Sequence, residues 1–227
     1  MAVEQDPLEE HLLDSLRTLV PPSAPVPAPS EVAAIWRAQV DSRQVDYAAR
    51  WLAQNGRTFY TIGSAGHESN AAVALALRAG DPALLHYRSG AFYLARAAQA
   101  GIDGVRDVML GVVAAAAEPI AGGRHKVFGR RELSIIPMTS TIASHLPRSV
   151  GIALAIDRAA RLRVSCPWPR DAIVLCSFGD ASLNHASAQA ALNTAAHTAF
   201  QRLPLPLLLL CEDNGLGISV PTPVGWV

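Results

Sequence analysis

Two stretches of the chain decide its fold: SFGDASLNHASAQAALNTAAH, residues 177–197, and LLLLCEDNGLGISVPTP, residues 207–223. Each holds the end of an apolar run that stops at acidic residues, and an alanine-rich, helix-like segment separates the two runs. Strands that are apolar throughout and alternate with helices are typical of a parallel sheet buried on both faces. We therefore predict an α/β fold, with a mostly parallel sheet and helices on both of its faces.

The same alternation extends upstream. Apolar periodicity predicts helices over 8–20, 31–54, 67–79, 91–101, 104–117, 144–162 and 186–200. Apolar or extended runs predict strands over 82–88, 171–179 and 205–213. Five prolines within residues 21–30 indicate an extended arm, and Ser30 is the expected N-cap of the helix that follows. We divide the chain into an N-terminal helix with a Pro-rich arm, 1–30, and a main domain, 31–227.

Composition excludes several classes of protein. Half of the 227 residues are hydrophobic and 17% are charged, which suits a globular domain with a large core. The 19 basic and 19 acidic residues cancel, so no bulk charge favours nucleic acid or an anionic membrane. The acidic N-terminus does not resemble a signal peptide, and the three cysteines lack metal-binding spacing. We expect a cytoplasmic protein with neither a nucleic-acid nor a membrane partner.

Polar side chains follow the two apolar runs at the ends of the expected strands. In open α/β sheets ligands bind at the carboxyl ends of strands, where Asp180 and Asn214 fall. A carboxylate and an amide oxygen are ligands that suit Mg²⁺, and the helix expected after Asp180 would present backbone N–H groups to an anion. Three glycines would let the backbone approach closely: Gly179, Gly215 and Gly217. These residues suggest a magnesium-bridged diphosphate, although Asp180 could instead be an N-cap and EDNG a simple turn.

The order of these motifs resembles a known family. GDA and EDN, each ending an apolar strand with a helix between them, resemble the thiamine diphosphate motif Gly-Asp-Gly followed by Asn-Asn. The surroundings resemble the alpha subunit of 2-oxoacid dehydrogenase first components, of the pyruvate or branched-chain type. The resemblance rests on FYTIGSAGHESNAAVALALRAGDPALLHYRSGAFYLA (59–95), TSTIASHLPRSVGIALA (139–155) and CEDNGLGISVPTP (211–223). It departs from the family where Ala181 replaces the second glycine and Asp213 the first asparagine.

The resemblance implies thiamine diphosphate and Mg²⁺ as cofactors in a pyrophosphate-type domain. It places Mg²⁺ on Asp180, Asn214 and the carbonyl of Leu216. It gives eight cofactor-binding residues: Tyr87, Arg88, Ser140, Ile142, Gly179, Asp180, Ala181 and Asn214. His67 and His125 are the catalytic candidates.

Several of these residues also have a simpler interpretation. Arg88 could be a surface arginine and Ile142 a core side chain, since most residues of these types have those roles. His67 and His125 could be surface or capping histidines.

The implied reaction is oxidative decarboxylation of a 2-oxoacid, with transfer of the acyl group to a lipoyl-bearing acyltransferase component. In this family the carboxylate that activates the cofactor comes from a beta-type subunit or a fused beta region. We therefore expect this chain to be the alpha part of a heterotetramer and to be incomplete as an enzyme without the beta part. The family extends beyond the Asn-Asn region, so we expect the domain to be truncated at its C-terminus. Two alternatives stay open: another thiamine diphosphate reaction, transketolase-like or acetoin-cleaving, and a non-catalytic assembly module.

Overall fold

The computed structural model describes residues 13–15, 17–18, 27–60, 62–138 and 141–227. The expected helix 8–20 and Pro-rich arm lie largely outside these residues. The α-helices are α2 (Pro29–Gln54), α3 (Asn70–Ala76), α4 (Gly90–Gln99), α5 (Gly104–Val112), α6 (His145–Leu162) and α7 (Ala186–Phe200). The strands are β1 (Ala83–Leu84), β2 (Val174–Gly179) and β3 (Leu207–Glu212), and two 3-10 turns are η1 (Arg131–Leu133) and η2 (Asp180–Ser182).

The strands form one parallel sheet in the order β1-β2-β3. Leu175 in β2 lies opposite Ala83 on one side and Leu208 on the other, and Gly179 lies opposite Glu212 where the strands end. The connection from β2 to β3 runs through α7, as a parallel pair requires. The predicted parallel α/β fold is therefore confirmed.

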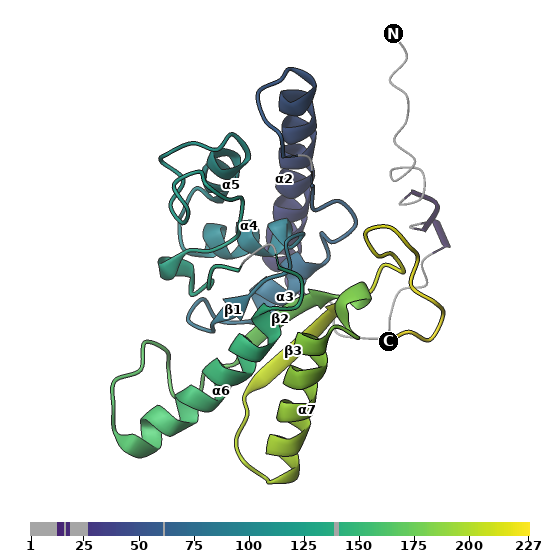
Figure 1. The fold of residues 1–227 in the computed structure, drawn as a ribbon. Helices are drawn as coiled ribbons and strands as arrows, with labels where there is room; N and C mark the ends of the chain where they lie inside the picture. Colours follow the sequence, from purple (N-terminus) through teal and green to yellow (C-terminus); the bar gives the residue numbers. More distant parts are fainter. Residues whose placement is uncertain (1–12, 16, 19–26, 61, 139–140) are drawn as a thin grey trace.

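Helices lie on both faces of the sheet, α2 to α5 on one side and α6 and α7 on the other (Figure 1). Adjacent residues of β2 show the division: Leu175 packs with the α2–α5 side, whereas Val174 and Cys176 pack with α6 and α7. Successive side chains of a strand point to opposite faces, so a strand covered on both sides must be apolar throughout. Among the described residues, no helix combines the length and the apolar character needed to cross a membrane.

Ser30 is not the N-cap of α2, and the alternative that Asp180 caps the following helix is excluded, whereas the predicted range 186–200 of that helix is confirmed. The helix α2 begins at Pro29 with Ala28 as its N-cap, so Ser30 lies inside the first turn, and the Glu31 carboxylate accepts from the Ala28 N–H at 2.9 Å. The helix α7 begins at Ala186, as predicted, and His185 caps it by accepting from the Ser187 N–H. Asp180 is the first residue of the turn η2, which precedes α7, so Asp180 is not the N-cap of α7 and the α7 N-terminus does not directly follow it.

Candidate functional site at the carboxyl ends of the strands

The carboxyl ends of the three strands meet at one edge of the sheet, and the candidate site is built on the residues that follow them. His86 comes two residues after β1, Asp180 directly follows β2, and Glu212 is the last residue of β3. The register brings them together because Gly179 is paired with Glu212 across β2 and β3. Residues far apart in the sequence are thus neighbours at the carboxyl ends of the strands, where ligands bind in open α/β sheets.

Asp180 is buried beneath the C-terminal segment. Its side chain and backbone are only 1% exposed. The Thr222 hydroxyl donates to its Oδ2 at 2.5 Å, and the Trp226 indole N–H donates to its carbonyl at 3.0 Å. Figure 1 shows the segment that carries these donors, in yellow, folding back beyond the end of β3. Asp180 therefore also anchors the segment 215–226, a structural role that the sequence did not indicate.

The loop after β3 lies against the turn that carries Asp180. A Cβ added to Gly217 would lie 3.4 Å from the Ala181 Cβ and 2.9 Å from the Val220 carbonyl oxygen, so glycine permits this close approach. The Asn214 Oδ1 accepts from the Leu216 N–H at 2.9 Å, which fixes the turn. The oxygen atoms of Asp180, Asn214 and Leu216 thus belong to segments that meet at one corner. Carboxylate, amide and carbonyl oxygens are the donor set that fits Mg²⁺.

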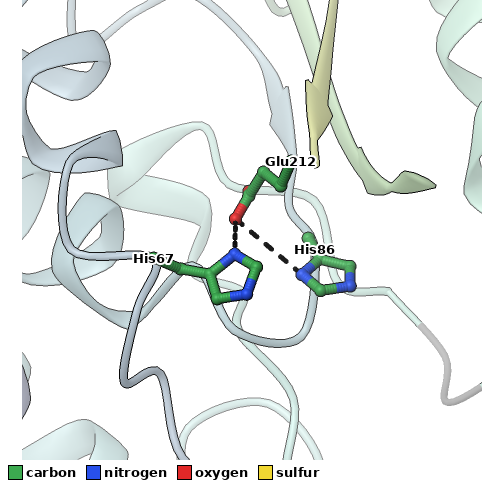
Figure 2. Close-up of side chains that lie close together, drawn as sticks. All are labelled: His67, His86 and Glu212. Atoms are coloured by element: carbon green, nitrogen blue, oxygen red, sulfur yellow. Dashed lines mark hydrogen bonds and ion pairs between the residues drawn. The ribbon is translucent and has the colours of Figure 1, made fainter. Parts of the chain in front are cut away.

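A second cluster, which we call the His-Glu cluster, consists of His67, His86 and Glu212 (Figure 2). Glu212 extends from the end of β3 toward both imidazole rings. The His67 Nδ1–H donates to Glu212 Oε2 at 2.5 Å, and the His86 Nδ1 lies 3.9 Å from the same oxygen. The two rings lie 5.5 Å apart, centre to centre.

Hydroxyl groups hold the His-Glu cluster in place. The Ser89 hydroxyl donates to Glu212 Oε1 at 2.8 Å, so both carboxylate oxygens have partners. The Ser177 hydroxyl of β2 accepts from the His86 backbone N–H at 2.7 Å. A Cβ on Gly179 would lie 3.2 Å from the His86 Nε2, so the glycine that precedes Asp180 makes room for this ring.

Burial and hydrogen bonding set the charges in the cluster. Burial lowers the pKa of His86 to about 4, although the Glu212 charge opposes the shift, so His86 is neutral near pH 7. Burial alone would raise the pKa of Glu212, but the His67 hydrogen bond and the nearby His86 hold that pKa below its usual value. Glu212 is therefore a buried carboxylate anion at the edge of the sheet.

The predicted phosphate ligand Arg88 lies between β1 and α4 and contacts a loop, around Gly63 and Ser64, that is bonded to α2. Its guanidinium donates to the Gly63 carbonyl at 2.6 Å and lies 5.2 Å from the centre of the Tyr87 ring. The Asp46 carboxylate of α2 accepts from the Ser64 N–H at 2.7 Å. Among the described residues no carboxylate lies within 4.0 Å of Arg88, so its charge remains available to an anion.

The other candidates lie in different places. Ile142 is half-buried and packs with the α6–α7 side of the core. His125 is exposed on the loop between α5 and η1, outside the His-Glu cluster, whereas His67 is one of the three members of that cluster. Ser140 lies outside the described residues.

Three residues of the site were not predicted from the sequence: His86, Ser89 and Thr222. A signal existed for His86, because it lies two residues after a buried strand, at the same edge as Asp180. Ser89 and Thr222 carry no such signal, since their roles depend on contacts with residues that are far away in the sequence.

Comparison with known proteins identifies relatives of this chain. The 2-oxoisovalerate dehydrogenase subunit alpha of Bacillus subtilis (strain 168) is 30% identical over 195 residues, which cover 84% of this chain and 53% of the relative. The mitochondrial 2-oxoisovalerate dehydrogenase subunits alpha of Bos taurus and Homo sapiens are 34% and 33% identical over 95 residues, 42% of this chain and 18% of each relative. The chain thus spans about half the length of the bacterial relative. The family model described as "Dehydrogenase E1 component" matches residues 36–225, and the chain belongs to that family.

Proposed function

We propose that this chain is the alpha part of a thiamine diphosphate-dependent 2-oxoacid dehydrogenase that acts on branched-chain 2-oxoacids. Membership of the dehydrogenase E1 component family supports the cofactor and the reaction class. The substrate class is supported by the relatives, which are named for 2-oxoisovalerate. The observation that carries the proposal is the meeting of Asp180 with the Asn214–Gly217 loop at the ends of paired strands.

In this function Asp180, Asn214 and the Leu216 carbonyl would hold Mg²⁺, and the Arg88 guanidinium would bind a phosphate oxygen. A planar guanidinium suits phosphate geometry, and the Gly63 carbonyl already fixes the position of Arg88. Ile142 and Ser140 are proposed to contact the central part of the cofactor, and His67 and His125 to serve catalysis. When bound, thiamine diphosphate supplies the electron sink for loss of CO₂ from the 2-oxoacid.

The departure at Ala181 is compatible with this proposal. Ala181 lies in the turn η2 and is not among the residues with positive φ, so its backbone does not need glycine. Its side chain is exposed and does not fill the interior of the turn. The alanine therefore gives no reason to prefer a non-catalytic module.

The complete enzyme requires partners. We propose a beta-type subunit or fused beta region that supplies the activating carboxylate, in a heterotetramer, and a lipoyl-bearing acyltransferase that accepts the acyl group. The proposed location is the cytoplasm.

The test is calorimetric titration of thiamine diphosphate in the presence of Mg²⁺, with and without a beta-type partner. Asp180→Asn should weaken Mg²⁺-dependent binding by about 100-fold or more, about 2.7 kcal/mol, because an amide replaces the charged metal ligand. The asparagine oxygen can still accept from Thr222, so the melting temperature should change little. Asp171→Asn, an exposed aspartate at the opposite end of β2 that pairs with Arg78, is the matched control. Cofactor affinity that is equal in wild type and Asp180→Asn would contradict the assignment.

A further inference from the structure

We propose that the His-Glu cluster binds one Zn²⁺ ion through His67 Nδ1, His86 Nδ1 and a carboxylate oxygen of Glu212. The three side chains come from the loop before α3, the segment after β1 and the end of β3 (Figure 2). Their ligand atoms all lie within 4.8 Å of one another. This site is distinct from the proposed Mg²⁺ ligands Asp180, Asn214 and Leu216.

The donor set selects the metal. Two imidazole nitrogens and one carboxylate oxygen suit Zn²⁺, which accepts nitrogen and oxygen ligands in a tetrahedral arrangement. Mg²⁺ instead requires near-octahedral oxygen coordination and keeps much of its water. Three protein ligands would leave a fourth position for water.

An unsatisfied atom points to the same conclusion independently. The His86 Nδ1 is buried and has no hydrogen-bond partner, and His86 as a whole is only 7% exposed. This nitrogen faces Glu212 Oε2 at 3.9 Å, which is too far for a hydrogen bond. Buried polar atoms without partners are rare in folded proteins. A metal ion between the ring and the carboxylate would satisfy the orphaned nitrogen.

The geometry requires only small movements. Bonds of about 2.0–2.2 Å in a tetrahedral zinc site place ligand atoms about 3.4 Å apart. Here His67 Nδ1 and His86 Nδ1 lie 2.5 Å and 3.9 Å from Glu212 Oε2, and no pair of ligand atoms exceeds 4.8 Å. Shifts of about 1–1.5 Å would reach the zinc geometry. Ser89, which holds the other Glu212 oxygen, would orient the carboxylate as outer hydrogen-bond partners of metal ligands do.

Zinc at this site would oppose Mg²⁺ binding, a consequence that rests on the proposed function. The Asn214 Nδ2–H donates a hydrogen bond to the His67 Nε2 at 3.3 Å, because the Nδ1–H of the same ring donates to Glu212. With zinc on Nδ1, the Nε2 carries a hydrogen, and two donors would face each other. The Asn214 amide must then turn its oxygen toward His67, and this oxygen is the proposed Mg²⁺ ligand. Two nearby divalent cations would also repel each other.

The primary experiment titrates the 227-residue chain with Zn²⁺ alone, without cofactor, against a colorimetric zinc chelator. We expect one Zn²⁺ per chain and at least tenfold weaker binding in His86→Asn and in Glu212→Gln. His197→Asn, an exposed histidine on α7, is the matched control and should bind like wild type. Absence of stoichiometric binding in wild type, or equal binding in all variants, would overturn the proposal.

Co²⁺ substitution keeps the test valid if a variant fails to fold. Wild-type chain loaded with Co²⁺ should give the intense visible absorption of a four-coordinate site, and the weak spectrum of octahedral Co²⁺ would overturn the proposal. A second arm repeats the Zn²⁺ titration with saturating thiamine diphosphate and Mg²⁺, where affinity should fall at least tenfold. If zinc binds but the cofactor does not, the proposed function fails and the zinc site stands. If both bind without mutual effect, the coupling through Asn214 is wrong.

Discussion

Thr222→Val should weaken the attachment of the C-terminal segment to the end of β2. The Thr222 hydroxyl donates to the Asp180 carboxylate at 2.5 Å, and Asp180 is almost completely buried. Valine has nearly the same shape as threonine but cannot donate, so the Asp180 carboxylate loses one hydrogen bond while the volume of the side chain hardly changes. The second anchor, from the Trp226 indole to the Asp180 carbonyl, remains.

The size of the effect follows from the kind of bond. A hydrogen bond to a charged group contributes about 1.5–3 kcal/mol, and about 1.4 kcal/mol corresponds to a tenfold change in an equilibrium. Local opening of residues 215–226 should therefore become about 10- to 150-fold more frequent. The rest of the fold does not depend on this bond, so global unfolding should change less.

Hydrogen exchange measures this opening directly. Three amides within the segment are bonded inside it: Gly217 to the Val220 carbonyl, Thr222 to that of Gly215, and Trp226 to that of Pro223. Their exchange should accelerate by the stated factor while amides of β2 keep their protection. Thr194→Val is the matched control, since that hydroxyl bonds only to the Ala190 carbonyl within α7. Exchange at the three amides within about twofold of wild type would refute the view that Asp180 anchors the segment.

Two further predictions concern stability. Because the pKa of His86 falls from 6.5 unfolded to about 4 folded, the unfolded state takes up a proton first. The free energy of unfolding should therefore drop by about 3 kcal/mol as the pH falls from 6.5 to 4. Chemical denaturation at a series of pH values should show that His86→Gln lacks this loss of unfolding free energy. A loss in the variant equal to that in wild type would contradict the low pKa of His86. Gly63→Ala should destabilise the chain by about 1–3 kcal/mol, because its Cβ would lie 2.6 Å from the Asp46 carboxyl carbon. In Gly151→Ala the added Cβ meets nothing within 4 Å, and this position inside α6 should instead gain about 0.5–1 kcal/mol of stability. Thermal melts of both variants measure these effects, and equal changes in melting temperature would contradict the steric argument.

The sequence predicted the layers of the fold better than the ends of individual helices. Continuous apolar runs identified β2 and β3, because a strand buried on both faces cannot alternate polar and apolar side chains. The cap Ser30 and the alternative cap Asp180 were wrong, because residues of these types often cap helices but are placed differently by their surroundings here. The range of α7, in contrast, was predicted correctly. Cap preferences are local and weak, so tertiary contacts override them.

The site was only partly predictable for a related reason. Asp180 and Asn214 could be assigned to one edge because parallel strands end together. The His-Glu cluster depends in addition on register, because Glu212 lies opposite Gly179, whose missing side chain leaves space for His86. A shift of one residue would turn Glu212 to the other face. No pattern within the sequence specifies that register.

The leucine run of β3 shows what an apolar pattern can and cannot report. Leu207, Leu209 and Cys211 point to the side of α6 and α7 and pack with the core there. On the opposite face Leu208 is 41% exposed, although the pattern alone predicts burial for it as well. The difference arises because Leu175 of β2 belongs to the α2–α5 core on that face, whereas its neighbour Leu208 in β3 lies outside it. A continuous apolar run thus predicts that both faces of a strand are buried. Which face is covered by the described residues depends on where the helices pack.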